Sequence, residues 1–289
     1  MKQALRFTQP KANGVAQTDL TGVGSGFPEL DRLTGGFQPG QLIFVVSRYS
    51  MGKTALALST VERVAINEDL PVIFFCLASC TSDLEMRLAS SISSIRLRDI
   101  QANQFSSEEC LYLTSANRAL EASKLHIDGN VSVSLKELTE RVQWFAYQHG
   151  RLGLIVVDDL ERTNIVSAKR GKALASEHDA ISYTLKLLAQ QHCCPVIVTS
   201  QLGRRIETRR DKRPTLKDLR AGGRLEQAAD MVITVYRDDY YNHDASHSLG
   251  VAEINVVKHI NGTTGFVNLA FNKSRAKFEN FTNMYQDSV

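Results

Sequence analysis

The residues whose spacing most clearly suggests chemistry form the stretch SRYSMGKT at positions 47–54, between an apolar run and a helical pattern. It matches the phosphate-loop pattern G-x-x-x-x-G-K-S/T except at the first position, where Ser47 stands. In that pattern backbone N–H groups at a helix start surround phosphates, Lys53 supplies positive charge and the Thr54 hydroxyl coordinates Mg²⁺. We therefore predict a site for ATP and Mg²⁺, with these nucleotide-binding candidates: Ser47, Arg48, Tyr49, Ser50, Met51, Gly52, Lys53 and Thr54.

Two later strand ends offer polar groups to the same site. Asp158 ends the apolar run LGLIVVD, and an acid at the carboxyl end of a parallel strand faces the crevice where ligands bind. We predict that Asp158 and Thr54 hold the Mg²⁺ shell. Gln201 ends the next run, CPVIVTSQ, where an amide can sense a γ-phosphate or relay its state to the following loop. A plain strand-end cap and a solvated turn residue are the alternatives for these two positions.

The positive charge of the chain is concentrated after Gln201. The whole sequence carries a formal charge of +3, whereas residues 204–220 hold eight basic and three acidic residues, so the remainder sums to about −2. Such a segment can bind phosphates of single-stranded DNA with little sequence preference, and the alternative is a solvated charged loop. No aromatic residue interrupts it, so we expect contacts to backbone phosphates. The candidate DNA-binding residues are Arg204, Arg205, Arg209, Arg210, Lys212 and Arg213.

Continuous apolar strands alternate with helical patterns over most of the chain, which predicts an α/β fold with a mainly parallel sheet covered on both faces. The last three strand patterns follow one another through short turns, so we expect antiparallel strands at the end. Residues 1–19 read as a flexible lead-in and residues 20–289 as one domain. A polar helical pattern covers about 97–123.

Composition excludes several classes of protein. There is no run of 18 apolar residues and no secretory signal, so we expect no membrane contact. The five cysteines lack metal-ligand spacing, and Cys76 and Cys194 lie in apolar runs. We therefore expect a reduced, cytoplasmic protein.

Residues from about 20 to 280 resemble the C-terminal motor domain of DnaB-type replicative helicases. The stretches TGVGSGFPELDRLTGGFQPGQLIFVVSRYSMGKT and SQLGRRIETRRDKRPTLKDLRAGGRLEQAADMVITVYRD carry the resemblance. It implies a RecA-like P-loop NTPase fold, a hexameric ring, ATP with Mg²⁺ between subunits and single-stranded DNA in the central channel. Arg237, in the second stretch, joins the predicted nucleotide-binding residues.

The chain departs from the family pattern at two catalytic positions. Ala78 stands where the family has the glutamate that polarises the attacking water, and a methyl group cannot accept a proton. Ile260 stands where an arginine reaches into the neighbouring subunit's site. Such arginines contribute about 10³- to 10⁵-fold to turnover in other NTPases. The family's N-terminal domain is also expected to be missing. We therefore expect ATP binding with impaired hydrolysis.

Two residues are candidates to compensate. Asp159 follows Asp158, where the family has an aromatic residue, and it is a candidate substitute base, the alternative being a solvated strand-end acid. Lys258 is retained from the family pattern and can stabilise γ-phosphate charge across an interface, although it lacks the forked geometry of arginine. With Gln201, these are the predicted catalytic residues.

Three functions remain open from the sequence. The first is ATP-dependent translocation on DNA or unwinding of it. The second is an accessory protein that binds ATP and DNA, or assembles with another helicase or replication protein, without turnover. The third is a RecA- or RadA-like recombination ATPase, because Gly-Phe-x-x-Leu-Asp also occurs there; KRPTLKDLR and YRDDYY favour the helicase branch.

Overall fold

The computed structural model describes residues 20–77, 79–131, 133–160, 172–220, 225–242 and 248–281. The predicted lead-in, residues 1–19, and Ala78 lie outside these ranges. Side chains are described for the same residues apart from 172–178, 220 and 225.

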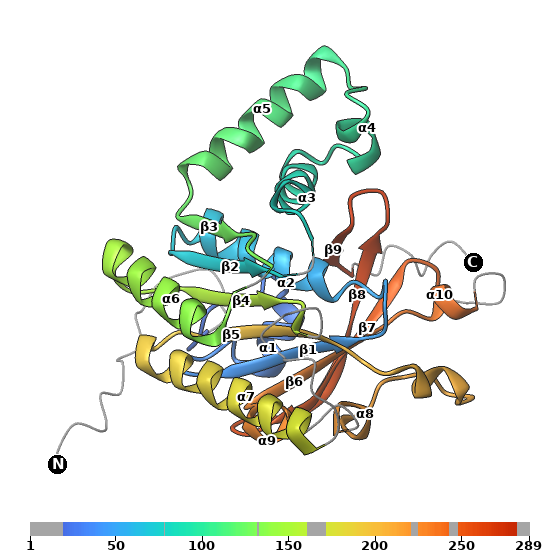
Figure 1. The fold of residues 1–289 in the computed structure, drawn as a ribbon. Helices are drawn as coiled ribbons and strands as arrows, with labels where there is room; N and C mark the ends of the chain where they lie inside the picture. Colours follow the sequence, from blue (N-terminus) through green and yellow to red (C-terminus); the bar gives the residue numbers. More distant parts are fainter. Residues whose placement is uncertain are drawn as a thin grey trace, which may run out of the picture.

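A nine-stranded sheet forms the centre of the described chain, in the order β3-β2-β4-β5-β1-β6-β7-β8-β9 (Figure 1). Neighbouring strands in the part β3-β2-β4-β5-β1-β6 pair in parallel, and the pairs β6–β7, β7–β8 and β8–β9 are antiparallel. This confirms the predicted mainly parallel sheet and the predicted antiparallel strands at its end. The strands are β1 (Leu42–Ser47), β2 (Val72–Cys76), β3 (Leu125–Asp128), β4 (Leu154–Asp158), β5 (Val196–Gln201), β6 (Met231–Tyr236), β7 (Val251–His259), β8 (Gly265–Asn272) and β9 (Lys277–Asn280).

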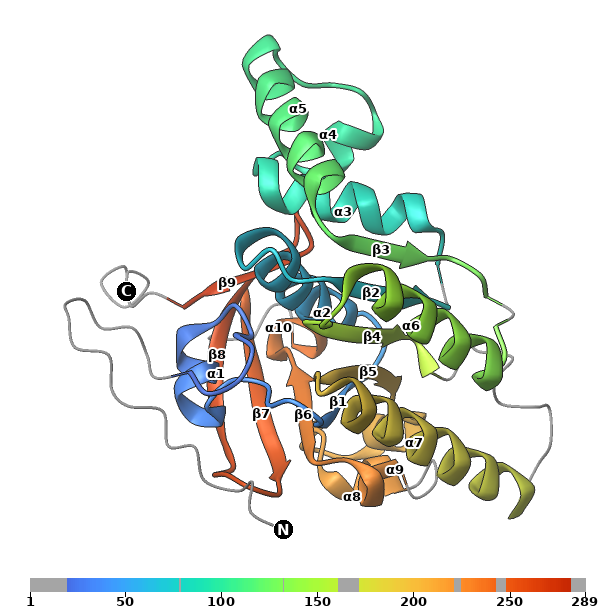
Figure 2. The same ribbon diagram turned by 90° about the vertical axis from the view of Figure 1, so that its left-hand side faces the viewer.

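The central parallel strands are buried on both faces because helices cover the two sides of the sheet (Figure 2). Ile43 and Val45 of β1 belong to the core that includes α2, whereas Leu42, Phe44 and Val46 pack with α6 and α7 on the other side. This alternation follows from the period of two in a strand, and it explains why these runs are apolar at every position.

The helices up to α7 follow the helical patterns of the sequence with one correction, whereas the short helices after β5 were not predicted. They are α1 (Pro28–Thr34), α2 (Lys53–Val61) with its π-helical continuation η1 (Glu62–Asn67), α3 (Thr81–Ser93), α4 (Leu97–Gln101), α5 (Ser107–Ala122), α6 (Leu135–His149), α7 (Lys172–His192), the 3-10 helix η3 (Arg204–Thr208), α8 (Leu216–Arg220), α9 (Leu225–Ala228) and α10 (Asp238–Tyr241). The helical pattern over 97–123 is two helices, because Asn103 adopts a left-handed φ of 52° and Ser106 with Glu109 forms a capping box that begins α5.

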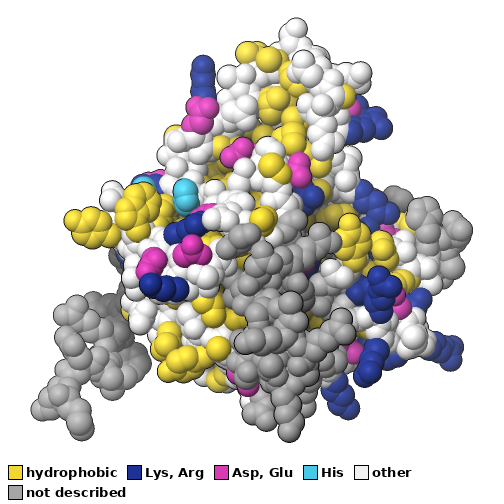
Figure 3. All heavy atoms as spheres, in the orientation of Figure 1, with side chains coloured by type: hydrophobic (Ala, Val, Ile, Leu, Met, Phe, Trp, Pro, Cys, Tyr) yellow, Lys and Arg dark blue, Asp and Glu magenta, His cyan; other side chains and the backbone are white. Residues whose placement is uncertain are grey.

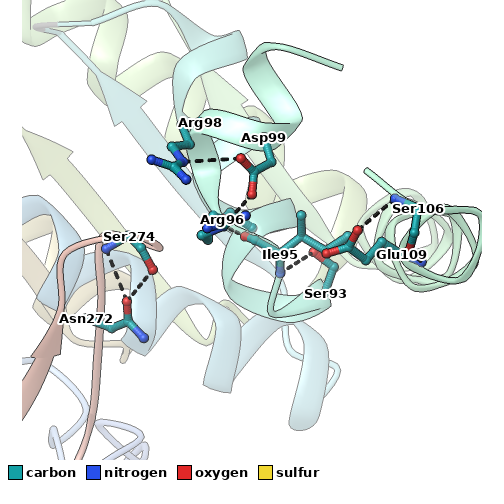
Figure 4. A network of polar contacts seen from close by, with 10 residues as sticks. Ser93, Ile95, Arg96, Arg98, Asp99, Ser106, Glu109, Asn272 and Ser274 are labelled. Atoms are coloured by element: carbon teal, nitrogen blue, oxygen red, sulfur yellow. Dashed lines mark hydrogen bonds and ion pairs between the residues drawn. The ribbon is translucent and has the colours of Figure 1, made fainter. Parts of the chain in front are cut away.

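Helices α3, α4 and α5 project from the sheet as an arm (Figures 1 and 2). Its base is tied to the turn between β8 and β9, where the Leu97 backbone N–H donates to the Ser274 carbonyl at 2.9 Å. Close by, the Asp99 carboxylate forms ion pairs with Arg96 at 2.5 Å and with Arg98 at 3.3 Å. The Ser274 backbone N–H and hydroxyl donate to the side-chain oxygen of Asn272 (Figure 4). The arm is therefore anchored at its base.

Among the described residues, no helix is both long and apolar enough to cross a membrane. The five cysteines are free, and Cys76 and Cys194 are buried in apolar surroundings. Burial raises the pKa of the Cys194 thiol to about 12, so it stays protonated. The cytoplasmic location stays a prediction.

Candidate nucleotide-binding site and basic segment

The predicted phosphate loop joins the carboxyl end of β1 to the start of α2. Gly52 has a φ of 106°, and a Cβ atom there would lie 2.7 Å from the Phe278 ring, so both conformation and space require glycine. Ser50 also has a positive φ, of 61°. The loop leads directly into the first turn of α2, where unsatisfied N–H groups and the helix dipole favour an anion. Met51 is buried, whereas Tyr49 is 57% exposed.

Lys53, Thr54 and Asp158 converge at the mouth of this loop. The Thr54 hydroxyl lies 2.9 Å and 3.1 Å from the two carboxylate oxygens of Asp158, which also accept a hydrogen bond from Thr199. A hydroxyl beside a carboxylate is a donor set that suits the hard, oxygen-preferring Mg²⁺ ion. The geometry thus brings together the residues predicted to hold the metal.

Asp158 is 2% exposed. Burial raises the pKa of its carboxyl group, because the charged form is taken out of water, while hydrogen bonds from Thr199 and Thr54 and the charge of Lys53 act in the opposite direction. A bound cation would replace the lost hydration. The site therefore favours a metal ion on electrostatic grounds.

Asp159 is also buried, and one of its oxygens lies 2.7 Å from the Lys53 ammonium group. Its other oxygen, Oδ1, has no hydrogen-bond partner within the described part of the chain. Asp159 is thus a member of the site, which speaks against the alternative of a solvated strand-end acid. Its role as a base stays a prediction.

Gln201 lies at the same edge of the sheet as the phosphate loop. Its Cα is paired with that of Ser47, and the next residue, Leu202, donates its backbone N–H to the Ser47 carbonyl at 2.9 Å. Thr199 precedes Gln201 by two residues and so lies on the same face of β5. Sequence reasoning overlooked Thr199, although this period of two could have identified it.

Two predicted nucleotide ligands direct their side chains elsewhere. The Arg48 guanidinium donates to the Leu202 carbonyl at 2.5 Å and to Glu207 at 2.7 Å and 2.9 Å. Arg237 contacts Asp239 at 3.1 Å and lies 4.1 Å above the Phe271 ring, which packs on Phe278. Both arginines therefore support the loop from the protein side, and direct contact with a nucleotide stays a prediction.

The two departures from the family pattern are at Ala78 and Ile260. Ala78 lies outside the described residues, but the chain before it is placed: Cys76 is in register with Asp158, and the Leu77 N–H donates to the Asp158 carbonyl at 2.6 Å. Ile260 is 56% exposed and follows β7 directly.

Lys258 does not approach the phosphate loop of its own chain. It pairs with Val232, which is beside Phe44 of β1, three residues before Ser47 and hence about 10 Å along the strand from the start of the loop. Its ammonium group donates to the carbonyls of Glu226 and Ala229 at 2.5 Å and 2.6 Å, at the amino ends of the parallel strands. Lys258 therefore cannot contact a nucleotide in its own chain. Its stabilisation of γ-phosphate charge in a neighbouring chain's site stays a prediction.

The basic segment, residues 204–213, divides into two groups. Arg209 contacts Asp218 at 3.0 Å, and Arg213 makes a two-pronged ion pair with Glu253 at 2.6 Å and 2.7 Å and lies 4.8 Å above the Tyr236 ring. Lys212 lies 4.5 Å above the Tyr241 ring. These three side chains hold the segment in place.

The second group is available to a ligand. Arg204, Arg205 and Arg210 are exposed, and none of them forms an ion pair with a described residue. Lys and Arg side chains gather on the lower right of the surface in Figure 3, where the chain after β5 runs in Figure 1. Only half of the predicted DNA-binding residues are thus uncommitted.

A phosphate loop after a buried parallel strand, with Asp158 and Gln201 at neighbouring strand ends, defines a P-loop nucleotide-binding protein. The chain belongs to the DnaB-like helicase C-terminal domain family, whose model matches residues 22–280. This membership supports the predicted helicase branch over the recombination ATPases.

The relatives agree with this assignment. The chain is 37% identical over 270 residues to the replicative DNA helicase DnaB of Geobacillus stearothermophilus, covering 93% of this chain and 59% of that protein. It is 37% identical over 271 residues to the replicative DNA helicase DnaC of Bacillus subtilis (strain 168), with the same coverage of 93% and 59%. The chain thus spans less than two thirds of the length of these relatives.

Solved structures give the fold. The ATPase domain of G40P superposes with a TM-score of 0.85 at 33% identity, covering 92% of this chain and 94% of that one. A DnaB-like replicative helicase, studied with its interactions with primase, also gives 0.85 at 33% identity, covering 92% and 64%. The RadB recombinase, at 18% identity and a TM-score of 0.56, shares the fold alone. The RecA-like fold is therefore confirmed.

Proposed function

We propose that this chain is an ATP-binding motor domain that acts on single-stranded DNA in replication. The convergence of Lys53, Thr54 and Asp158 at the phosphate loop carries the proposal, because these are the groups that bind the phosphates and Mg²⁺ of a nucleotide. The relatives' activity as replicative DNA helicases supports DNA as the substrate. The exposed Arg204, Arg205 and Arg210 would contact its phosphates.

We further propose that hydrolysis is slow. Ala78 cannot activate water, and Asp159, the candidate substitute, shares its charge with Lys53. When the γ-phosphate draws Lys53 toward itself, the Asp159 carboxylate is freed to orient water and accept its proton. Mg²⁺, when bound, neutralises charge on the β- and γ-phosphates.

Assembly is a third part of the proposal. Lys258 and Ile260 lie at the amino ends of the parallel strands, away from the loop of the same chain, so a second subunit is needed to bring them to a nucleotide. A ring of identical chains or a mixed ring with another helicase meets this need. In either ring Lys258 would have to leave the Glu226 and Ala229 carbonyls or be shared with them.

The test is steady-state ATP turnover with and without single-stranded DNA. Lys53→Ala is the blank, but it leaves the buried Asp159 without its cation, so Thr54→Ala serves as a second blank that keeps the ion pair. We expect DNA-stimulated turnover above both blanks. A chain that binds neither ATP nor DNA would exclude the proposal.

A second candidate is an accessory protein that binds ATP and DNA without turnover. The ion pair of Asp159 with Lys53 favours it, since a carboxylate held by a lysine is not poised to activate water. Saturable ATP binding without turnover, even on DNA, would select this candidate over the motor.

A further inference from the structure

Arg48 connects the phosphate loop to the basic segment. Although it is the second residue of the loop, all three nitrogens of its guanidinium group donate to residues after β5: the Leu202 carbonyl and one carboxylate oxygen of Glu207. The Arg48 side chain is only 9% exposed. A buried guanidinium group with a hydrogen bond from each of its three nitrogens holds its partners in one geometry.

Glu207 lies in η3, the first turn of the basic segment, between the exposed Arg204 and Arg205 on one side and Arg210 on the other. Ile206, next to it, is buried and anchors the turn in the core. The position of this turn therefore sets the position of the uncommitted arginines.

The phosphate loop and the chain that leads to η3 also begin next to each other, at the ends of the paired strands β1 and β5. Ser47 and Gln201 are paired at the ends of β1 and β5, and the Leu202 N–H donates to the Ser47 carbonyl. Tyr241 is close enough to Arg48 and Glu207 for both charges to act on its pKa, which burial raises. The Lys212 ammonium group lies 4.5 Å above the Tyr241 ring. Arg48 is thus surrounded by groups of the basic segment and its supports.

A nucleotide would change this arrangement. Its phosphates bring several negative charges into the loop that contains Arg48, where they compete with Glu207 for the guanidinium. If Arg48 loosens its hold on Glu207, η3 is freed to move with its arginines. By thermodynamic reciprocity, DNA that stabilises one position of η3 must change the affinity for the nucleotide by the same factor.

We propose that the Arg48–Glu207 pair transmits nucleotide occupancy from the phosphate loop to the basic segment and so sets the affinity of Arg204, Arg205 and Arg210 for single-stranded DNA. This proposal rests on the proposed function. Glu207 is a positioning residue in it, because it acts on DNA only through its neighbours.

The test measures the coupling between the two ligands. Binding of a fluorescein-labelled oligothymidylate to the full chain is followed by anisotropy, with Mg²⁺ alone and with Mg²⁺ and saturating hydrolysis-resistant ATP analogue. In the unaltered chain we expect the two dissociation constants to differ by a factor in the range of about 5 to 150. In Glu207→Gln we expect that factor to fall to one, with each ligand still bound.

The matched control is Asp211→Asn, which makes the same charge change four residues away without touching Arg48. It corrects for any general rise in DNA affinity, and we expect it to keep the coupling factor of the unaltered chain. Glu207→Asp keeps the charge with a shorter reach and should restore part of the factor.

The outcomes separate the two proposals. Loss of coupling in Glu207→Gln but not in Asp211→Asn supports the inference. An unchanged factor in Glu207→Gln, or a factor of one in the unaltered chain that binds both ligands, overturns the inference and leaves the proposed function standing. Failure of the unaltered chain to bind either ligand overturns both.

Discussion

The ammonium group of Lys53 lies 2.7 Å from a carboxylate oxygen of Asp159, and the side chains are only 13% and 5% exposed. The lysine predicted to bind phosphate is therefore neutralised by a carboxylate of its own chain. Breaking a buried pair leaves uncompensated charges, so phosphate must replace Asp159 as the partner of Lys53, and the carboxylate must gain water or a cation. Asp159 is therefore expected to affect both the affinity for ATP, through its ion pair with Lys53, and the rate of hydrolysis, as the candidate base.

Replacing Asp159 by asparagine should raise ATP affinity. The amide removes the charge that competes with phosphate for Lys53, and one charge-assisted hydrogen bond corresponds to about 10-fold in the dissociation constant. Equilibrium titration with a fluorescent ATP analogue measures the change. Asp69→Asn, which breaks the exposed ion pair of Asp69 with Lys124, is the matched control and should have no effect.

The same variant tests the base. If Asp159 accepts the proton of the attacking water, Asp159→Asn should lower ATP turnover by about 10²- to 10⁴-fold while nucleotide remains bound. Rapid-quench measurement of phosphate release reports this step. Equal turnover in the variant and the unaltered chain would remove Asp159 from the mechanism and leave it as a partner of Lys53 only.

Replacing Asp158 by asparagine should stabilise the metal-free fold in a pH-dependent way. The folded-state pKa of Asp158 is raised by burial, so its favourable contribution is fully present below the unfolded value of 3.8 and is lost as the pH rises through the folded-state pKa. An amide never ionises. The gain in melting temperature should therefore be larger at pH 8 than at pH 5 in EDTA, and a gain that shrinks as the pH rises would contradict the burial argument.

Neutralising Arg204, Arg205 and Arg210 together should weaken binding to single-stranded DNA without unfolding the chain, because these side chains are exposed and form no ion pair with a described residue. Loss of three phosphate contacts should reduce the slope of log affinity against log salt by about 2. The control removes Arg118, Lys136 and Arg151, which are exposed on or beside α5 and α6. An unchanged slope would make the segment a solvated surface.

Restoring the two family residues should raise turnover. We expect Ala78→Glu with Ile260→Arg to gain at least about 10-fold in DNA-stimulated ATP hydrolysis, a small part of what an arginine finger contributes elsewhere. The variant Ala78→Gln with Ile260→Arg is the matched control, since it keeps the size of the side chain and lacks the base. Equal rates for the two variants would show that a carboxylate at position 78 does not act as the base.

Much of the fold follows from local patterns. Continuous apolar runs such as LIFVVS and LIVVD are typical of strands buried on both faces of a parallel sheet, and the structure has them there. The Gly-Lys-Thr turn likewise specifies its own geometry, because Gly52 alone tolerates a φ of 106° against Phe278. The break within 97–123 was missed because the capping box at Ser106 and Glu109 is weaker than the helical pattern around it.

The class of fold and the position of the phosphate loop follow from the amino-acid sequence alone, and the sequence also predicts that Lys53, Thr54 and Asp158 bind the phosphates and Mg²⁺. The partners of the charged side chains were decided by the tertiary structure. Arg48 and Glu207 are separated by 159 residues, and Lys258 is turned toward α9 by the antiparallel return of β7. Charge and spacing along a chain are local quantities, whereas an ion pair depends on which distant segments the folded sheet places side by side.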